Sequence, residues 1–211
     1  MGASRIGGML RPFIRPARHP CWFVERGTSI RRFRQAVIYV PRGNGKTSIA
    51  AALALYMSFL DGEGGADGYG AAVTRNHARI LFDTAREMAR RSPEIRRRYG
   101  VEALANSVWQ ARTSSQFRPI SSDAKALDGL NVKTAVCDEI ASHKTSEVYD
   151  VLLTAMGKRC NPLLFAISTA TGKNAGIASS YRTTPSGCSK GTQADDRLFA
   201  LIYTIDPEDH P

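Results

Sequence analysis

Two short stretches of this 211-residue sequence place side chains where they could bind and cleave a nucleoside triphosphate. The first spans residues 41–47 and reads P-R-G-N-G-K-T, directly after an apolar run. Backbone N–H groups of such a loop, with the N-terminus of the helix that follows, can surround phosphate oxygens. In this pattern Lys46 would reach the β and γ oxygens and Thr47 would hold Mg²⁺. The predicted nucleotide-binding residues are Pro41, Arg42, Gly43, Asn44, Gly45, Lys46 and Thr47.

The loop departs from the usual G-x-x-x-x-G-K-[ST] pattern because position 40 is Val rather than Gly. An alternative interpretation is an ordinary turn, since N-G and G-K turns are common between strands and helices. The flanking residues favour the phosphate loop: residues 37–40 suit a buried strand, and residues 48–60 are strong helix formers.

The second stretch, residues 133–139, is an apolar run that ends in adjacent carboxylates at Asp138 and Glu139. Ligands of open parallel sheets bind at the carboxyl ends of the strands, so both side chains are expected to face the phosphate loop. Asp138 would complete the Mg²⁺ shell with Thr47, and Glu139 would orient or deprotonate the attacking water. A third strand end carries the hydroxyls of Ser168, Thr169 and Thr171, which could sense the γ-phosphate. A plain strand-to-loop turn is the alternative there.

The elements around these stretches alternate between strand and helix patterns. Strands are predicted at residues 36–40, 69–74, 133–139, 162–167 and 198–203, with a hairpin or inserted edge pair at 107–111 and 115–120. Helices are predicted at residues 46–60, 77–91, 124–128 and 147–156, with a helical turn near residues 92–94. This order predicts an α/β fold with a mostly parallel central sheet flanked by helices.

The composition is strongly basic, with 29 Lys and Arg against 19 Asp and Glu and a net charge of +10. Eight arginines and one acid precede residue 35, a pattern that fits either nucleic-acid phosphates or a solvated arm. The four cysteines are far apart and predict neither a zinc site nor a disulfide framework, so a reduced cytoplasmic setting is expected. The longest apolar stretch, residues 49–60, is too short to span a membrane, and the N-terminus lacks the apolar region of a secretory signal.

The ordered motifs resemble the ATPase domain of the large terminase subunit, the DNA-packaging motor of tailed bacteriophages. The resemblance covers about residues 32–209. It rests on V-P-R-G-N-G-K-T (40–47), Y-G-A-A-V-T-R-N-H-A-R-I-L-F (69–82), F-R-P-I-S-S-D-A-K-A-L-D-G-L-N (117–131), V-C-D-E-I-A-S-H-K (136–144), A-I-S-T-A-T-G (166–172) and F-A-L-I-Y-T-I-D-P-E-D (199–209).

This resemblance implies a P-loop NTPase of the ASCE, RecA-like type that uses ATP and Mg²⁺. Lys46 and Thr47 match the family's Walker A residues, and Asp138 and Glu139 match the Walker B aspartate and catalytic glutamate. Ser168, Thr169 and Thr171 fall in its coupling motif, and Arg42 resembles a loop arginine that acts on the γ-phosphate. Arg75 and Arg118 are candidates for an arginine that binds DNA or acts in a neighbouring subunit.

The expected organisation is a basic extended arm at residues 1–19, a P-loop ATPase domain at 20–205 and, at 206–211, the start of a linker to a nuclease domain that the chain lacks. The family's adenine-site segment before the loop is only loosely matched by residues 20–23. The resemblance also implies the partners: double-stranded DNA, the portal protein, the small terminase subunit and copies of the chain in a pentameric ring. The expected location is the host cytoplasm, at the procapsid portal vertex, with no membrane partner.

Three functions are compatible with these residues. The first is an ATP-hydrolysing motor that translocates double-stranded DNA into a procapsid. The second is a nucleotide-dependent DNA-binding or portal-binding module with little hydrolysis of its own. The third is another helicase-like or recombinase-like ATPase, against which stands the lack of helicase motifs beyond the two phosphate stretches.

Overall fold

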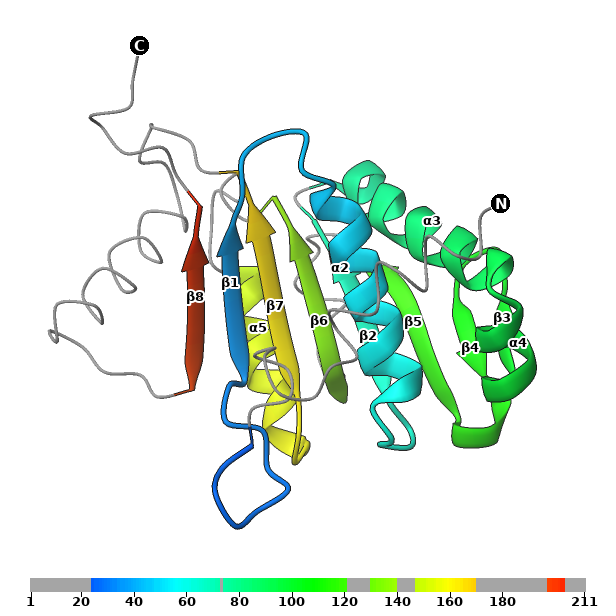
Figure 1. Cartoon of the computed structure of the whole chain (residues 1–211), viewed down its shortest axis with the longest axis horizontal. Coiled ribbons are helices and arrows are strands. Elements are labelled where there is room, and N and C mark those ends of the chain that lie inside the picture. The colour runs from blue at the N-terminus through cyan, green and yellow to red at the C-terminus, as the bar shows by residue number, and fades with distance from the viewer. Residues whose placement is uncertain (1–23, 73, 121–129, 140–146, 170–196, 204–211) are drawn as a thin grey trace, which may run out of the picture.

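A computed structural model describes residues 24–72, 74–120, 130–139, 147–169 and 197–203 of the chain. Its central feature is a sheet in the order β3-β4-β5-β2-β6-β7-β1-β8. The six neighbouring strands β5, β2, β6, β7, β1 and β8 are parallel. At the other end of the sheet, β4 pairs antiparallel with both β3 and β5 (Figure 1). The strands are β1 (Gln35–Tyr39), β2 (Asp67–Ala71), β3 (Val101–Ala103), β4 (Val108–Gln110), β5 (Ser115–Ile120), β6 (Val132–Asp138), β7 (Leu163–Ser168) and β8 (Leu198–Ile202).

Helices cover both faces of this sheet (Figure 1). They are α2 (Lys46–Leu55), which continues as a π-helical turn at Tyr56–Leu60, α3 (Arg75–Arg91), α4 (Pro93–Tyr99) and α5 (Glu147–Ala155). The alanines of α2 are buried, which lets this helix pack closely on the sheet. Helices α2 and α3 share one apolar core with the sheet, and α5 packs into a second core on the opposite face. No helix in the described part is long and apolar enough to cross a membrane.

The predicted alternation of strands and helices is confirmed, and three details differ. The second strand is β2, which ends at Ala71 rather than Thr74, because Thr74 caps α3 by accepting a hydrogen bond from the His77 N–H. The first helix leaves α geometry after Leu55. Strand β3 was not predicted, and it extends the expected hairpin of β4 and β5 at the edge of the sheet. The predicted helix at residues 124–128 lies outside the described residues.

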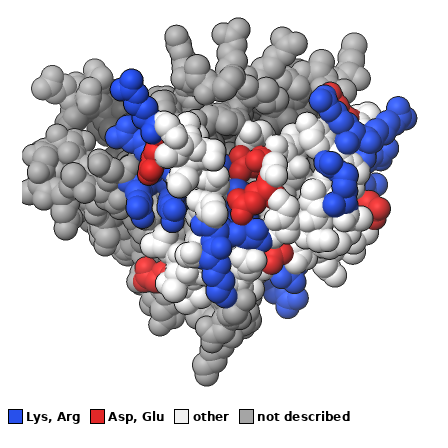
Figure 2. Space-filling view, turned by 90° about the horizontal axis from the view of Figure 1, so that it is seen from below, with Lys and Arg blue, Asp and Glu red and all other residues white. Residues whose placement is uncertain are grey.

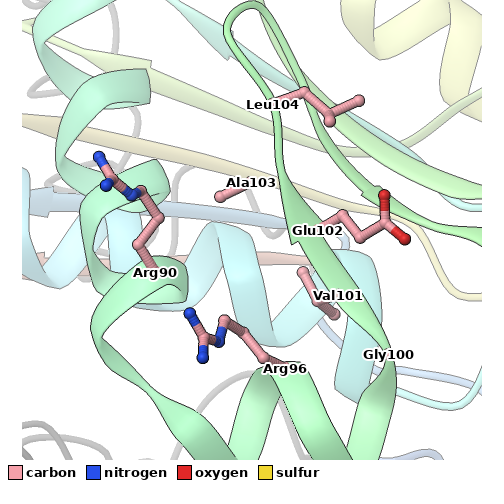
Figure 3. Close-up of a pocket in the computed structure, with 7 residues that line it drawn as sticks. All are labelled: Arg90, Arg96, Gly100, Val101, Glu102, Ala103 and Leu104. Atoms are coloured by element: carbon pink, nitrogen blue, oxygen red, sulfur yellow. The ribbon is translucent and has the colours of Figure 1, made fainter.

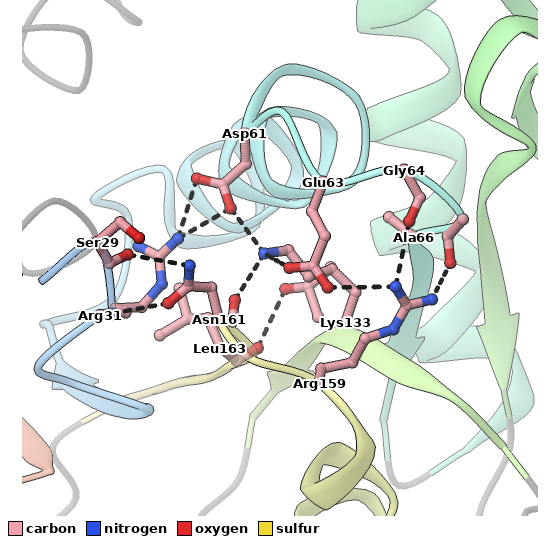
Figure 4. Close-up of polar contacts among 12 residues, drawn as sticks. Ser29, Arg31, Asp61, Glu63, Gly64, Ala66, Lys133, Arg159, Asn161 and Leu163 are labelled. Atoms are coloured by element: carbon pink, nitrogen blue, oxygen red, sulfur yellow. Dashed lines mark hydrogen bonds and ion pairs between the residues drawn. The ribbon is translucent and has the colours of Figure 1, made fainter.

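At the edge of the sheet opposite the carboxyl ends of the parallel strands, charged residues form a buried network, which we call the lower-edge network. Its centre is Lys133 at the start of β6, which is 0% exposed. The Lys133 ammonium donates to Asp61 and Glu63 at 2.7 Å each and to the Asn161 carbonyl at 2.6 Å (Figure 4). Figure 2 views the molecule from this side and shows acidic groups flanked by basic ones.

Two arginines complete the lower-edge network. Arg31 donates to both carboxylate oxygens of Asp61 at 2.9 Å, and Arg159 donates to Glu63 at 3.2 Å and to the backbone carbonyls of Gly64 and Gly65. Arg31 is 5% exposed, so the solvated arm, one of the two interpretations of the arginines before residue 35, does not include it. The network ties the end of the first helix to the starts of β6 and β7 and to the segment that leads into β1.

Candidate nucleotide site

The predicted phosphate loop connects β1 to α2 at the carboxyl edge of the sheet. Gly43 and Gly45 both have left-handed backbone geometry, with φ of 82° and 63°, which side chains with a Cβ rarely adopt. Gly45 is the N-cap of α2, so the helix begins at Lys46. The Asn44 side-chain amide donates to the Pro41 carbonyl at 3.2 Å and supports the turn. The loop therefore presents a helix N-terminus, where backbone N–H groups have no partner inside the helix.

Asp138 closes the opposite side of this site. The strands β1 and β6 lie on either side of β7, so their carboxyl ends approach each other across one strand. The Thr47 hydroxyl donates to Asp138 Oδ2 at 3.1 Å. Burial raises the pKa of the Asp138 carboxyl above its ordinary value, the nearby Glu139 charge adds to that rise, and the Thr47 hydrogen bond and the Lys46 charge oppose it.

The donor set of this pair fits Mg²⁺. A hydroxyl oxygen and a carboxylate oxygen converge from two different elements, and oxygen ligands of this kind are what a hard divalent cation prefers. The Lys46 ammonium contacts the Pro41 carbonyl at 3.4 Å. A phosphate oxygen could replace this long contact.

Glu139 follows Asp138 in an unusual backbone conformation. Its φ is 54°, in the left-handed region that residues other than glycine seldom occupy, and such strain concentrates at functional sites. Its backbone N–H donates to Asp138 Oδ1 at 2.9 Å. The Thr169 hydroxyl lies 3.4 Å from Glu139 Oε1 and donates to it. This contact links the predicted catalytic carboxylate to the strand end at Ser168, whose carbonyl accepts from the Val40 N–H at 3.0 Å.

These groups surround one pocket of about 410 Å³. It is lined by Arg42, Gly43, Lys46, Thr47, His77, Ile80, Asp138 and Glu139. The structure thus brings six of the sequence-predicted residues to one cavity. His77 and Ile80 were missed, since helical periodicity gives no indication that the first turns of α3 reach a site built by α2 and β6.

The remaining predicted residues lie elsewhere. Pro41, Asn44 and Gly45 belong to the loop but do not line the pocket. Arg75 is exposed at the first position of α3, two residues before His77. Arg118, on β5, donates to the Tyr69 hydroxyl at 3.0 Å and lies over the Tyr69 ring. Ser168 is fully buried, and Thr171 lies outside the described residues, as do residues 20–23.

The fold and the pocket define a P-loop NTPase with a mostly parallel sheet. The family model described as "Terminase large subunit, ATPase domain" matches residues 15–183. The chain therefore belongs to the family of terminase large-subunit ATPase domains.

Individual relatives agree with this assignment. The large terminase subunit of Enterobacteria phage HK97 is 24% identical over 147 residues, which are 68% of this chain and 29% of the relative. Protein YmfN of Escherichia coli K12 is 38% identical over 82 residues, which are 39% of this chain and 18% of YmfN. The segments matched in sequence thus span less than a third of either relative.

Solved structures show the same fold. The crystal structure of the HK97 large terminase superimposes with a TM-score of 0.72 at 20% identity, covering 100% of this chain and 45% of that chain. The large terminase of a thermophilic bacteriophage, in complex with ADP, gives a TM-score of 0.59 at 12% identity, covering 86% of this chain and 43% of that chain.

Proposed function

We propose that this chain is the ATPase motor domain of a terminase large subunit, which hydrolyses ATP to move double-stranded DNA into a procapsid. The observation that carries the proposal is the convergence of Lys46, Thr47, Asp138 and Glu139 on one pocket in a chain of this family. The pocket combines a helix N-terminus that can bind phosphate, two oxygen ligands that can bind a divalent cation and a carboxylate that can orient a water molecule.

Each residue then has a distinct task. The loop N–H groups and the Lys46 ammonium bind the β- and γ-phosphates, and Arg42 at the pocket wall faces the charge that develops on the γ-phosphate. Thr47 and Asp138 would hold Mg²⁺, which neutralises charge on the phosphate oxygens. Glu139 orients the attacking water and accepts its proton. The hydrogen bond from the Thr169 hydroxyl to Glu139 supports a coupling role for the segment that contains Ser168, Thr169 and Thr171. A change in the position or charge of the Glu139 carboxylate would alter this hydrogen bond and so reach the segment.

The partners follow from this motor role. Double-stranded DNA is the cargo, and the portal protein, the small terminase subunit and further copies of the chain in a pentameric ring complete the packaging machine at the portal vertex of the procapsid, in the host cytoplasm. Arg75 is the better placed of the two candidate trans-acting arginines, because it is exposed beside the helix turn that lines the pocket, whereas Arg118 is already bonded to Tyr69.

The test is steady-state phosphate release, with and without double-stranded DNA, by the wild type and the Glu139→Gln variant. The variant should lose roughly 10²-fold or more in turnover while it binds a fluorescent ATP analogue as tightly as the wild type. Glu87→Gln, the same substitution in an exposed ion pair, is the control and should change neither quantity.

Two outcomes would contradict the proposal. Unchanged hydrolysis by Glu139→Gln would remove Glu139 from its role. Binding of the ATP analogue and DNA by the wild type without hydrolysis at any protein concentration would favour the nucleotide-dependent binding module.

A further inference from the structure

A second pocket, of about 430 Å³, lies between the edge strand β3 and the helices α3 and α4, and we call it the β3 groove. It is lined by Arg90, Arg96, Gly100, Val101, Glu102, Ala103 and Leu104 (Figure 3). Five consecutive residues of the chain thus form one wall. The opposite wall is built by the end of α3 and by α4. Gly100, with a φ of 64°, turns the chain from α4 directly back into β3.

The wall formed by β3 has main-chain groups available for pairing. Within the described sheet β3 pairs with β4 and with no strand on its other side. The Leu104 N–H donates to the Ser107 carbonyl across the hairpin, at 2.8 Å. Because main-chain groups alternate in direction along a strand, the N–H and C=O of Ala103 point away from β4, at the free edge of the sheet. An edge of this kind is a template for an added strand.

The position of this edge is fixed by α3. Arg79 donates to the Asn106 side chain at 2.9 Å and to the Ala105 carbonyl at 3.2 Å, and Arg86 donates to the same carbonyl at 3.1 Å. Two arginines of one helix face thus hold the tip of the β3–β4 hairpin. The groove exists before any ligand binds, which lowers the entropy cost of binding.

The next arginines along this surface face the groove instead of the hairpin. Arg90, one turn after Arg86, has Glu87 as its ion-pair partner at 3.6 Å. Arg96 is exposed, and no carboxylate of the described residues lies within ion-pair distance of it. In Figure 3 both side chains lie on the side of β3 toward which Ala103 projects, whereas Glu102 projects away. The groove therefore presents positive charge beside an open strand edge.

We propose that the β3 groove binds an extended acidic segment of a partner protein, which pairs with β3 as an added strand and places carboxylates on Arg90 and Arg96. Charge complementarity selects the acidic side chains, since Arg–carboxylate contacts are strong and directional. A nucleic-acid backbone would use the two arginines but would leave the N–H and C=O groups of the strand edge without a role. This site is separate from the nucleotide pocket and does not depend on hydrolysis.

The experiment measures the fluorescence anisotropy of a fluorescein-labelled peptide, Glu-Val-Glu-Val-Glu-Val, titrated with the full chain. The peptide should bind, and the Arg90→Gln/Arg96→Gln variant should weaken its binding by about tenfold or more. The matched control is Arg97→Gln/Arg98→Gln, which removes two charges from α4 outside the groove and should leave affinity within about twofold of the wild type. The same peptide with every backbone amide N-methylated should not bind, because it cannot donate to the strand edge.

Four results would overturn the proposal. They are no binding of the acidic peptide, equal binding of its N-methylated form, an equal loss in the control variant, and tighter binding of a 12-base-pair DNA duplex that is abolished by Arg90→Gln/Arg96→Gln. The last result would assign the groove to nucleic acid. Circular dichroism melts of each variant separate a lost contact from a lost fold.

Discussion

The charged side chain of Lys133 is buried, which the sequence pattern does not indicate. The residue lies near the start of the strand that delivers Asp138, yet its ammonium group is fully buried between Asp61 and Glu63. Burying a charge is costly unless it is paired and hydrogen-bonded, and Lys133 satisfies this condition with two carboxylates and one carbonyl. Removal of the cation would leave the carboxylates of Asp61 and Glu63 close together, with Arg31 and Arg159 as their remaining cationic partners.

We expect Lys133→Met to lower the free energy of unfolding by about 3–5 kcal/mol, the usual cost of removing one partner from a buried ion pair. Urea unfolding followed by circular dichroism would measure it. Arg91→Gln is the control, because it breaks an exposed pair with Glu87 and should leave the free energy of unfolding nearly unchanged. A loss in Lys133→Met no larger than that of the control would show that the network contributes little.

The pH dependence of stability gives a second test of the lower-edge network. Burial alone would raise the pKa of Glu63, but the hydrogen bond and charge of Lys133, with those of Arg159, lower it below its ordinary value of 4.5. A group with a lowered pKa in the folded state stabilises the fold above its unfolded pKa, and this contribution is lost as the pH falls through the folded pKa.

The wild type should therefore exceed Glu63→Gln in stability by a constant amount above pH 4.5, and this difference should shrink as the pH falls further. Thermal melts of both proteins from about pH 3 to about pH 7 would measure this difference in stability. Glu94→Gln, in a largely exposed pair at 3.9 Å, should show no such change. A wild-type advantage that grows on acidification would reverse the sign and refute the assignment.

The candidate site was largely predictable residue by residue, because its chemistry depends on residue types at fixed spacing. Arg42, Lys46, Thr47, Asp138 and Glu139 all reach the pocket. The left-handed backbone of Glu139 was not predictable, since nothing in a Glu side chain requires it. In this conformation the Glu139 N–H donates a hydrogen bond to Asp138 Oδ1.

At the scale of elements, the first helix and β2 show how close packing sets local geometry. The helix becomes π-helical at Tyr56–Leu60, where it crosses Gly68. A Cβ at Gly68 would lie 2.3 Å from Ser58 Oγ, 3.0 Å from Phe117 and 3.1 Å from Thr134. The glycine is therefore required by contact, although its backbone conformation is ordinary.

Gly68→Ala should destabilise the chain by about 1–3 kcal/mol through overpacking. Ser58→Ala should relieve part of this cost in the double variant, and it should cost little alone because Ser58 Oγ is buried without a hydrogen-bond partner. Gly70→Ala is the comparison, since its nearest contacts are at 3.1 Å. Denaturant unfolding would measure the free energy of unfolding of all these variants. Equal losses of stability in Gly68→Ala and Gly70→Ala would contradict the argument from the closer contacts of Gly68.

Long, periodic elements were predicted well, and short ones were not. The apolar stripe of α3 and the buried run of β6 identify them from sequence, because burial imposes the period of the element. Strand β3 has three residues and one buried side chain, so it has no measurable period. The hairpin that joins it to β4 is held by the tertiary contacts of Arg79 and Arg86, which no local sequence pattern indicates.

At the scale of the whole molecule, the net charge of +10 bears on the proposed DNA partner. Arg31 is buried, so it is not one of the exposed basic residues near the N-terminus. Residues 1–23 still carry four arginines and no acid, at positions 5, 11, 15 and 18. Contacts of these side chains with DNA phosphates would release counterions on binding.

Replacement of these four arginines by Gln should weaken binding to a DNA duplex and should reduce the slope of log K against log salt by up to ~3.6, at ~0.9 per phosphate contact. Binding isotherms between about 50 and 200 mM salt would measure the slope, with ATP hydrolysis as the control for an intact site. An unchanged slope would show that the segment does not contact DNA.

The lower-edge network also has a mechanical consequence for the molecule. It fastens the end of the first helix, the starts of β6 and β7 and the approach to β1 at one edge of the sheet, while the nucleotide pocket lies at the other. Because the strands between the two edges are hydrogen-bonded to one another, we expect any displacement that accompanies nucleotide binding to be smallest at the network and largest in the loops that surround the pocket.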